Sequence, residues 1–278
     1  MPHTYTNDIV TFYEDTGDGP VVVLIHGHSL DLRMWKYQVA PLVDMGYRVM
    51  RYDARGHGRS MVTTSGYTWD NYAFDLAELL DRLNIEKPAA EPLAVEAAHI
   101  VGLSMGGAIA LKFALDYAER VLSLTLVDST LPGFTYSEEF GSSIQALGEA
   151  VISEGAAAAF ERLWLPHPLF DGLRRHPEKF AEAAEMVAGF QAAEYRPEAE
   201  TPGYAQPDLA SRLSEVTART LVVVGEEDLP DFRLIADVME ANIPGARQAV
   251  LAGCGHVPPM EDPAAFNRVL MEFLASPA

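Results

Sequence analysis

A serine lies between two glycines in the segment Gly102-Leu103-Ser104-Met105-Gly106. An apolar, strand-like run precedes this segment and a helical pattern follows it, which places the serine on a sharp strand-to-helix turn. Such a turn strains the serine backbone and lifts its hydroxyl clear of the chain, while the glycines avoid collisions with the neighbouring strand and helix. This pattern predicts that Ser104 is a nucleophile.

A serine hydroxyl becomes nucleophilic when a base removes its proton and a third group orients that base. His256 lies in a glycine-flanked loop after the last strand pattern, at the edge of a parallel sheet where ligands bind. Asp228 follows the preceding strand, in Gly225-Glu226-Glu227-Asp228, and is favoured as the acid over the two glutamates before it. Asp128, at the end of an earlier strand, is an alternative acid, although a structural role is favoured for it.

Attack on a carbonyl group also needs hydrogen-bond donors for the oxyanion that forms. The backbone N–H of Met105 begins the helix after the serine, where N–H groups lack partners and the helix dipole is positive. We expect the second donor to be the backbone N–H of His28, in the loop that follows the first buried strand. Whether the imidazole of His28 faces the pocket or solvent stays open at this stage.

Short strand-like runs alternate with helical patterns in the first half of the chain, which indicates a parallel sheet with helices on both faces. The chain then becomes rich in Ala and Glu with helical periodicity, before the strand pattern resumes. We therefore expect an α/β core of residues 1–131 and 216–278 and an inserted helical cap of residues 132–215. The expected strands are 21–25, 47–52, 99–103, 121–127, 220–225 and 247–251, and the expected cap helices are 143–154, 156–165, 177–195 and 207–213. A Pro- and Ala-rich stretch at 87–97 reads as a surface loop.

The chain has 278 residues with 40 acidic and 20 basic side chains, a net charge of −20. This charge argues against nucleic acids and anionic membranes as partners. No run of about 18 apolar residues and no signal-peptide pattern is present, so we expect no membrane association and a cytoplasmic protein. The single cysteine, Cys254, agrees with a reducing compartment. No histidine pair has the spacing of a helical metal site, so no metal is expected, and a monomer and a homodimer both remain open.

Five ordered motifs together resemble those of the α/β-hydrolase superfamily, and they span nearly the whole chain outside the expected cap. They are His26-Gly27-His28, residues 53–60, residues 102–107, residues 225–228 and Gly255-His256. The resemblance implies an eight-stranded, mostly parallel sheet, a helical cap over the site and no cofactor, and it assigns nucleophile, acid and base to the residues chosen above. The serine turn is similar to that of small bacterial serine esterases and enol-lactonases.

We therefore expect a serine hydrolase that cleaves a small carboxylic ester or lactone through an acyl-enzyme intermediate. Side chains of the cap and of the histidine loop are expected to bind the substrate: Phe134, Tyr136, Trp164, His167 and Val257, with Phe140, Leu165 and Phe170 as further wall residues. No arginine cluster marks a carboxylate-bearing substrate, although Arg33 or Arg162 would reach one. An apolar acyl group or lactone is therefore favoured.

Three other activities remain open for the same set of residues. They are a C–C bond hydrolase of the meta-cleavage type, a perhydrolase or cofactor-free haloperoxidase, and a small-molecule receptor with slow hydrolase activity. Leu103 and His28-Ser29-Leu30 stand where the C–C hydrolases usually carry Asn and Gly-Pro-Gly, which counts against the first.

Overall fold

The structure of the chain is a computed structural model that describes residues 3–86, 97–196, 199 and 207–276. Within these residues eight strands form one sheet in the order β1-β2-β4-β3-β5-β6-β7-β8. Their bounds are His3–Thr6 (β1), Ile9–Thr16 (β2), Val21–Ile25 (β3), Arg48–Tyr52 (β4), Ala98–Leu103 (β5), Val121–Val127 (β6), Thr220–Gly225 (β7) and Arg247–Leu251 (β8). β2 pairs antiparallel with β1 and β4, and the other neighbours are parallel. The expected eight-stranded, mostly parallel sheet is confirmed.

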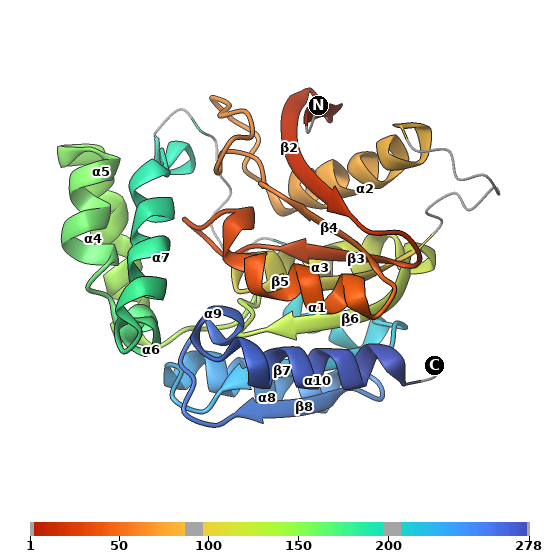
Figure 1. The fold of residues 1–278 in the computed structure, drawn as a ribbon. Coiled ribbons are helices and arrows are strands. Elements are labelled where there is room, and N and C mark those ends of the chain that lie inside the picture. Colours follow the sequence, from red (N-terminus) through yellow and green to blue (C-terminus); the bar gives the residue numbers. More distant parts are fainter. Residues whose placement is uncertain (1–2, 87–96, 197–198, 200–206, 277–278) are drawn as a thin grey trace.

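The parallel strands are apolar on both faces because helices cover both sides of the sheet. Along β3, Val21, Val23 and Ile25 pack into one hydrophobic cluster, whereas Val22 and Leu24 pack into a second one on the opposite face. The first cluster includes residues of α2, α3 and α8, and the second includes residues of α1 and α10 (Figure 1). These helices are Lys36–Asp44 (α1), Trp69–Glu86 (α2), Met105–Asp116 (α3), Pro230–Asn242 (α8) and Pro263–Ala275 (α10).

A group of helices lies between β6 and β7 in the sequence, and we call residues 138–195 the helical insertion. It contains α4 (Glu138–Glu154), α5 (Ala156–Ala159), α6 (Asp171–Arg174) and α7 (Pro177–Gly189), with short turns η3 (Phe160–Trp164), η4 (Pro168–Phe170) and η5 (Ala193–Tyr195). In Figure 1 these helices stand beyond the ends toward which the parallel strands point. The insertion is therefore placed where loops from several strands converge.

The insertion differs from expectation at three points, the first being that the expected helix 143–154 already begins at Glu138. The expected helix 156–165 passes from α5 into a π-helical turn at Phe160–Trp164. The expected helix 177–195 ends at Gly189, because Phe190 is extended and Ala192 has a left-handed backbone, with φ at 48°. At the end of the expected cap, the structure has a 3-10 turn, η7 (Ala210–Glu215), in place of a helix from residue 207.

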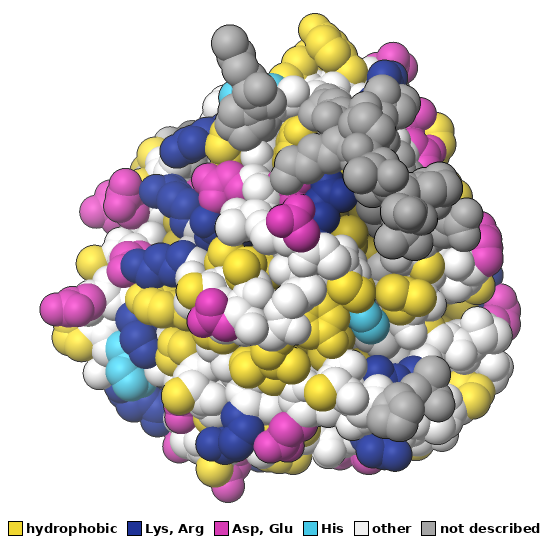
Figure 2. All heavy atoms as spheres, turned by 45° about the vertical axis from the view of Figure 1, so that its right-hand side comes forward, with side chains coloured by type: hydrophobic (Ala, Val, Ile, Leu, Met, Phe, Trp, Pro, Cys, Tyr) yellow, Lys and Arg dark blue, Asp and Glu magenta, His cyan; other side chains and the backbone are white. Residues whose placement is uncertain are grey.

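Four short elements complete the described chain: η1 (Leu32–Trp35), η2 (Ala118–Arg120), α9 (Pro258–Glu261) and the turn η7 given above. Nearly all of the expected surface loop 87–97 lies outside the described residues. Among the helices of the described chain, none combines the length and apolar character needed to span a membrane. On the face shown in Figure 2, acidic side chains are scattered among basic ones rather than gathered in one patch.

Candidate active site

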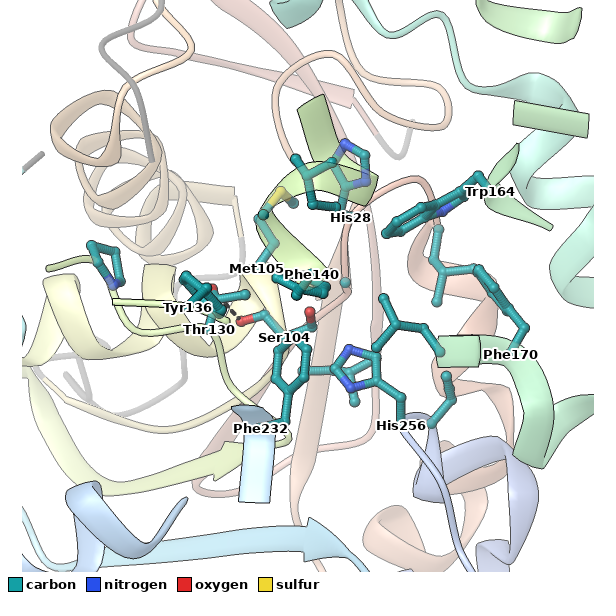
Figure 3. A pocket seen from close by; sticks show the side chains of 18 of the residues that line it. His28, Ser104, Met105, Thr130, Tyr136, Phe140, Trp164, Phe170, Phe232 and His256 are labelled. Carbon is teal, nitrogen blue, oxygen red and sulfur yellow. Dashed lines mark hydrogen bonds between the residues drawn. The ribbon is translucent and has the colours of Figure 1, made fainter. Parts of the chain in front are cut away.

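Ser104 occupies a strained turn between β5 and α3. Its φ is 52° and its ψ is −113°, a backbone conformation that residues other than glycine rarely adopt. The surrounding structure holds this strain, because the Ser104 N–H donates to the Val127 carbonyl at 2.9 Å and its own carbonyl accepts from Gly107 N–H. The side chain is thereby directed away from the sheet and into a cavity (Figure 3).

The glycines on either side of the serine are needed because backbone crowds both positions. A Cβ atom on Gly102 would lie 2.0 Å from the Gly106 carbonyl oxygen, and one on Gly106 would lie 2.3 Å from the Ile25 carbonyl oxygen. Neither contact is relieved by rotating a side chain, because the opposing atoms are backbone. The close approach of β5, α3 and β3 at this turn therefore requires glycine.

His256 and Asp228 lie beside each other because they follow adjacent parallel strands, β8 and β7. Nδ1 of His256 is 2.8 Å from Oδ2 of Asp228, and both side chains are buried. Oδ1 of Asp228 accepts a further hydrogen bond from Leu229 N–H at 2.7 Å. Ser104 and His256 point toward each other in Figure 3, although the described structure contains no hydrogen bond between them. Such contacts are often loose before substrate binds.

The other acidic residues near this loop have different partners. Glu226 accepts from Gly253 N–H at 3.0 Å, and Glu227 forms an ion pair with Arg175 of the helical insertion. Asp128 follows β6, and its Oδ1 accepts from Gly225 N–H at 2.9 Å. Of the acids considered from the sequence, Asp228 is the one that contacts the imidazole.

Glu261 was not considered from the sequence, yet it holds the loop that carries His256. Its carboxylate accepts hydrogen bonds from Gly255 N–H at 2.6 Å and from Val257 N–H at 2.8 Å, one on each side of the histidine. Burial raises the pKa of Glu261, and these two N–H groups act in the opposite direction. No local signal marks this role, because a glutamate in a short helix after a loop reads as a surface residue.

The two expected oxyanion donors belong to His28 and Met105, which line the same cavity as Ser104. Within the described residues, neither the Met105 N–H nor the His28 N–H has an intramolecular acceptor. The imidazole of His28 lines the cavity, and its Nε2 lies 3.1 Å from Oε1 of Glu194 and 3.3 Å from the Tyr195 hydroxyl. These contacts resolve the side-chain orientation that the sequence left open.

A cavity of about 240 Å³ lies above Ser104, between the sheet edge and the helical insertion. Of the expected wall residues, Tyr136, Trp164, Val257, Phe140 and Phe170 line it. Phe134, His167 and Leu165 do not. Phe134 packs against Tyr136 from outside, and Nε2 of His167 is 3.1 Å from the Ser143 hydroxyl.

Several lining residues were missed from the sequence: Trp69, Ile144, Leu169, Tyr195 and Phe232. Phe232 packs on the His256 ring at 4.3 Å between centroids, but it belongs to a helix that reads as a core helix. Neither Arg33 nor Arg162 lines the cavity, because Arg33 pairs with Asp31 and Arg162 pairs with Glu154. The described lining contains no Asp, Glu, Lys or Arg.

One group of possible metal-binding side chains occurs among the described residues. It consists of Asp128, Asp228 and His256, with one oxygen or nitrogen atom from each within 4.8 Å of the others. The His256–Asp228 hydrogen bond already uses two of these groups. The expectation that no metal is bound stays a prediction.

The chain is similar to known proteins over most of its length. The family model described as the alpha/beta hydrolase family matches residues 22–269. A thermophilic esterase from Thermogutta terrifontis superposes with a TM-score of 0.80 at 32% identity, over 98% of this chain and 96% of that one. The enol-lactonase from Burkholderia xenovorans LB400 has a TM-score of 0.83 at 25% identity, over 99% and 100% of the two chains.

A relative with a different named activity is similar over nearly the same length. The 2-hydroxy-6-oxo-6-phenylhexa-2,4-dienoate hydrolase of Comamonas testosteroni is 29% identical over 290 residues, which is 96% of this chain and 92% of that protein. The resemblance seen in the five motifs is confirmed by the family match, which spans most of the chain and runs from β3 to beyond β8. This chain belongs to the alpha/beta hydrolase family.

Proposed function

We propose that the protein is a serine hydrolase that cleaves small, uncharged carboxylic esters or lactones through an acyl-enzyme. The observation that carries this proposal is the placement of Ser104 on a strained turn, facing a histidine whose far nitrogen contacts a buried aspartate. A hydroxyl on a strained turn, facing a cavity next to an oriented base, is the arrangement that nucleophilic acyl transfer requires.

In this mechanism the Ser104 hydroxyl attacks the carbonyl carbon while Nε2 of His256 takes its proton. Nδ1 of His256 faces Asp228 at 2.8 Å, so the carboxylate orients the ring and stabilises its protonated form. The N–H groups of His28 and Met105 bind the oxyanion. As the C–O bond breaks, His256 returns the proton to the leaving alkoxide.

Water then completes the reaction with the same groups. His256 accepts a proton from water, the hydroxide attacks the acyl carbon, and the serine regains its proton as it leaves. An ester yields a carboxylic acid and an alcohol, and a lactone yields a hydroxy acid. We propose that the helical insertion, within the expected cap of residues 132–215, acts as a lid, because Trp164, Phe140 and Phe170 cover the cavity.

The character of the cavity supports an uncharged acyl group. Its described lining is mainly aromatic and aliphatic and contains no Lys or Arg to pair with a carboxylate. The two imidazoles that line it, His28 and His256, already contact Glu194 and Asp228. Burying an unpaired carboxylate there would cost several kcal/mol. This favours ester or lactone cleavage over a C–C hydrolase acting on a dienoate, which is the class that the Comamonas protein's name describes.

A panel of p-nitrophenyl esters of graded acyl length, with matched lactones and carboxylate-bearing esters, tests the proposal. We expect Ser104→Ala to lower kcat by about 10⁴-fold or more, with labelling by a fluorophosphonate lost at the same time. Ser153→Ala, at an exposed serine of α4, is the matched control and should retain the wild-type rate. Full activity of Ser104→Ala would refute the nucleophile, and a preference for carboxylate-bearing substrates would refute the substrate class.

A further inference from the structure

Asp128 is a second buried carboxyl group directly behind the acid of the proposed triad. Its side chain is 1% exposed, and one of its oxygens lies within 4.8 Å of both an Asp228 oxygen and a His256 ring nitrogen. Its backbone is also constrained, with φ at 40° and its N–H donating to the Val223 carbonyl at 2.8 Å. The structure therefore fixes this carboxyl group close to the catalytic pair.

The two oxygens of Asp128 have unequal environments. Oδ1 accepts a hydrogen bond from Gly225 N–H, whereas Oδ2 is buried and has no donor among the described residues. A buried carboxylate needs a hydrogen-bond donor at each oxygen. A buried carboxylic acid needs a donor for its carbonyl oxygen and an acceptor for its O–H group. The carboxylate of Asp228 is the neighbouring acceptor to which a protonated Oδ2 of Asp128 would donate a hydrogen bond.

We propose that Asp128 carries a proton and donates a hydrogen bond from Oδ2 to the Asp228 carboxylate, which makes it a positioning residue for the acid–base pair. The inference rests on the proposed function. Two adjacent buried carboxylates cannot both ionise without strong repulsion, and Asp228 is the one that faces the imidazole. The shared proton leaves one negative charge to orient His256.

The surrounding charges agree with a neutral Asp128. Burial raises its pKa well above the ordinary value, and the charge of Asp228, its hydrogen bond and the charge of Glu261 raise it further, whereas Gly225 N–H acts in the opposite direction. His256 in turn faces Asp228, Glu261 and His167, and burial keeps the pKa of His167 low, at about 4. His167 is therefore uncharged at neutral pH, and the charged groups around His256 are Asp228 and Glu261, with the Arg175 guanidinium 3.9 Å from a Glu261 oxygen.

The pH dependence of kcat/KM for a p-nitrophenyl ester distinguishes a protonated Asp128 from an ionised one, because the acidic limb reports protonation of His256. Asp128→Asn copies the protonated acid, with an oxygen for Gly225 N–H and an NH2 group for Asp228. Asp128→Leu has a similar volume but no donor. We expect the acidic limb of Asp128→Asn to stay in place and that of Asp128→Leu to move to higher pH by about one unit, because Asp228 then presents its full charge.

An ionised Asp128 predicts the opposite sign. Both substitutions would then remove a negative charge beside His256 and move the acidic limb to lower pH, and this result overturns the proposal. Infrared difference spectra of wild type against Asp128→Asn provide a readout that does not depend on activity or on the leucine variant folding. Loss of a protonated-acid carbonyl band supports the proposal, and loss of a carboxylate band contradicts it. If Ser104→Ala remained active, the proposed function would fail while these spectra still decided the state of Asp128.

Discussion

Substitution of Glu261 tests how the proposed active site is held together, because this buried carboxylate accepts hydrogen bonds from the backbone on both sides of His256. Its oxygens accept from Gly255 N–H at 2.6 Å and from Val257 N–H at 2.8 Å. Glutamine has one carbonyl oxygen, so Glu261→Gln retains one of these bonds and turns an NH2 group toward the other N–H. The variant therefore changes the loop that carries His256, the proposed base, without removing the side chain at position 261.

The magnitude follows from the bond that is lost. A hydrogen bond to a charged group contributes about 1.5–3 kcal/mol, and a buried N–H left without a partner costs about 1–3 kcal/mol. Because burial raises the pKa of Glu261, removing the charge recovers part of this loss. We therefore expect the free energy of unfolding to fall by about 2 kcal/mol, roughly a thirtyfold change in the unfolding equilibrium. Loosening His256 should also lower kcat about tenfold or more with little change in KM.

Urea unfolding followed by tryptophan fluorescence and ester kinetics on the same preparations measure both effects. Glu272→Gln is the matched control, because it makes the same chemical change on the exposed face of the following helix. A Glu261→Gln protein with the urea midpoint and kcat of Glu272→Gln would show that the two N–H contacts do not hold the histidine loop, and the reasoning above would be wrong.

Three further predictions concern other contacts. Trp164→Phe removes the indole N–H, which donates to the Ser29 hydroxyl at 2.7 Å, together with part of a buried ring system that lines the cavity, so kcat of ester cleavage should fall several-fold and stability by about 1–3 kcal/mol in urea unfolding. Gly106→Ala should lower the free energy of unfolding by about 3 kcal/mol because its methyl meets backbone, whereas Gly189→Ala, which meets open space, should change it by less than about 1 kcal/mol. Burial lowers the pKa of His99 to about 4 from its ordinary value of 6.5. The unfolded chain therefore binds the proton first, and stability should fall as the pH drops from 6.5 toward 4, a loss that His99→Asn should reduce in urea midpoints measured against pH.

The sheet was largely predictable from local pattern because its central strands are buried on both faces. Six strand-like runs, of which 21–25 is continuously apolar, correspond to β3 to β8, and the resemblance supplied the total of eight strands. β1 and β2 were not read from pattern, since His3–Thr6 is alternately exposed and buried and Ile9–Thr16 mixes apolar and acidic residues. Antiparallel strands with one face toward solvent carry a weaker hydrophobic signal than parallel strands covered by helices on both sides.

The nucleophile, acid and base were chosen from the same kind of local information, and the structure brings those three residues together. Short segments of the sequence show both the types of these residues and their positions directly after strands. The cavity wall was not predictable in this way, because a side chain on a helix lines a cavity only when tertiary packing turns it there. Phe232 and Phe134 are both aromatic and close to helix starts, yet Phe232 contacts His256 and Phe134 lies behind Tyr136.

The loops that carry the proposed catalytic groups share one feature that the motifs themselves do not encode. Glu261 holds the His256 loop, Trp164 of the helical insertion bonds to Ser29 beside the His28 N–H, and Asp128 holds the Gly225 N–H before Asp228. In each contact, a polar atom of a buried side chain that lies outside the five motifs forms a hydrogen bond with a loop that belongs to one of them. Because these contacts fix geometry rather than touch substrate, their loss should appear in kcat more than in KM. Short motifs thus identify the proposed chemical groups, but the precision of the site depends on single buried contacts, of which those of Trp164 and Asp128 come from far away in the sequence.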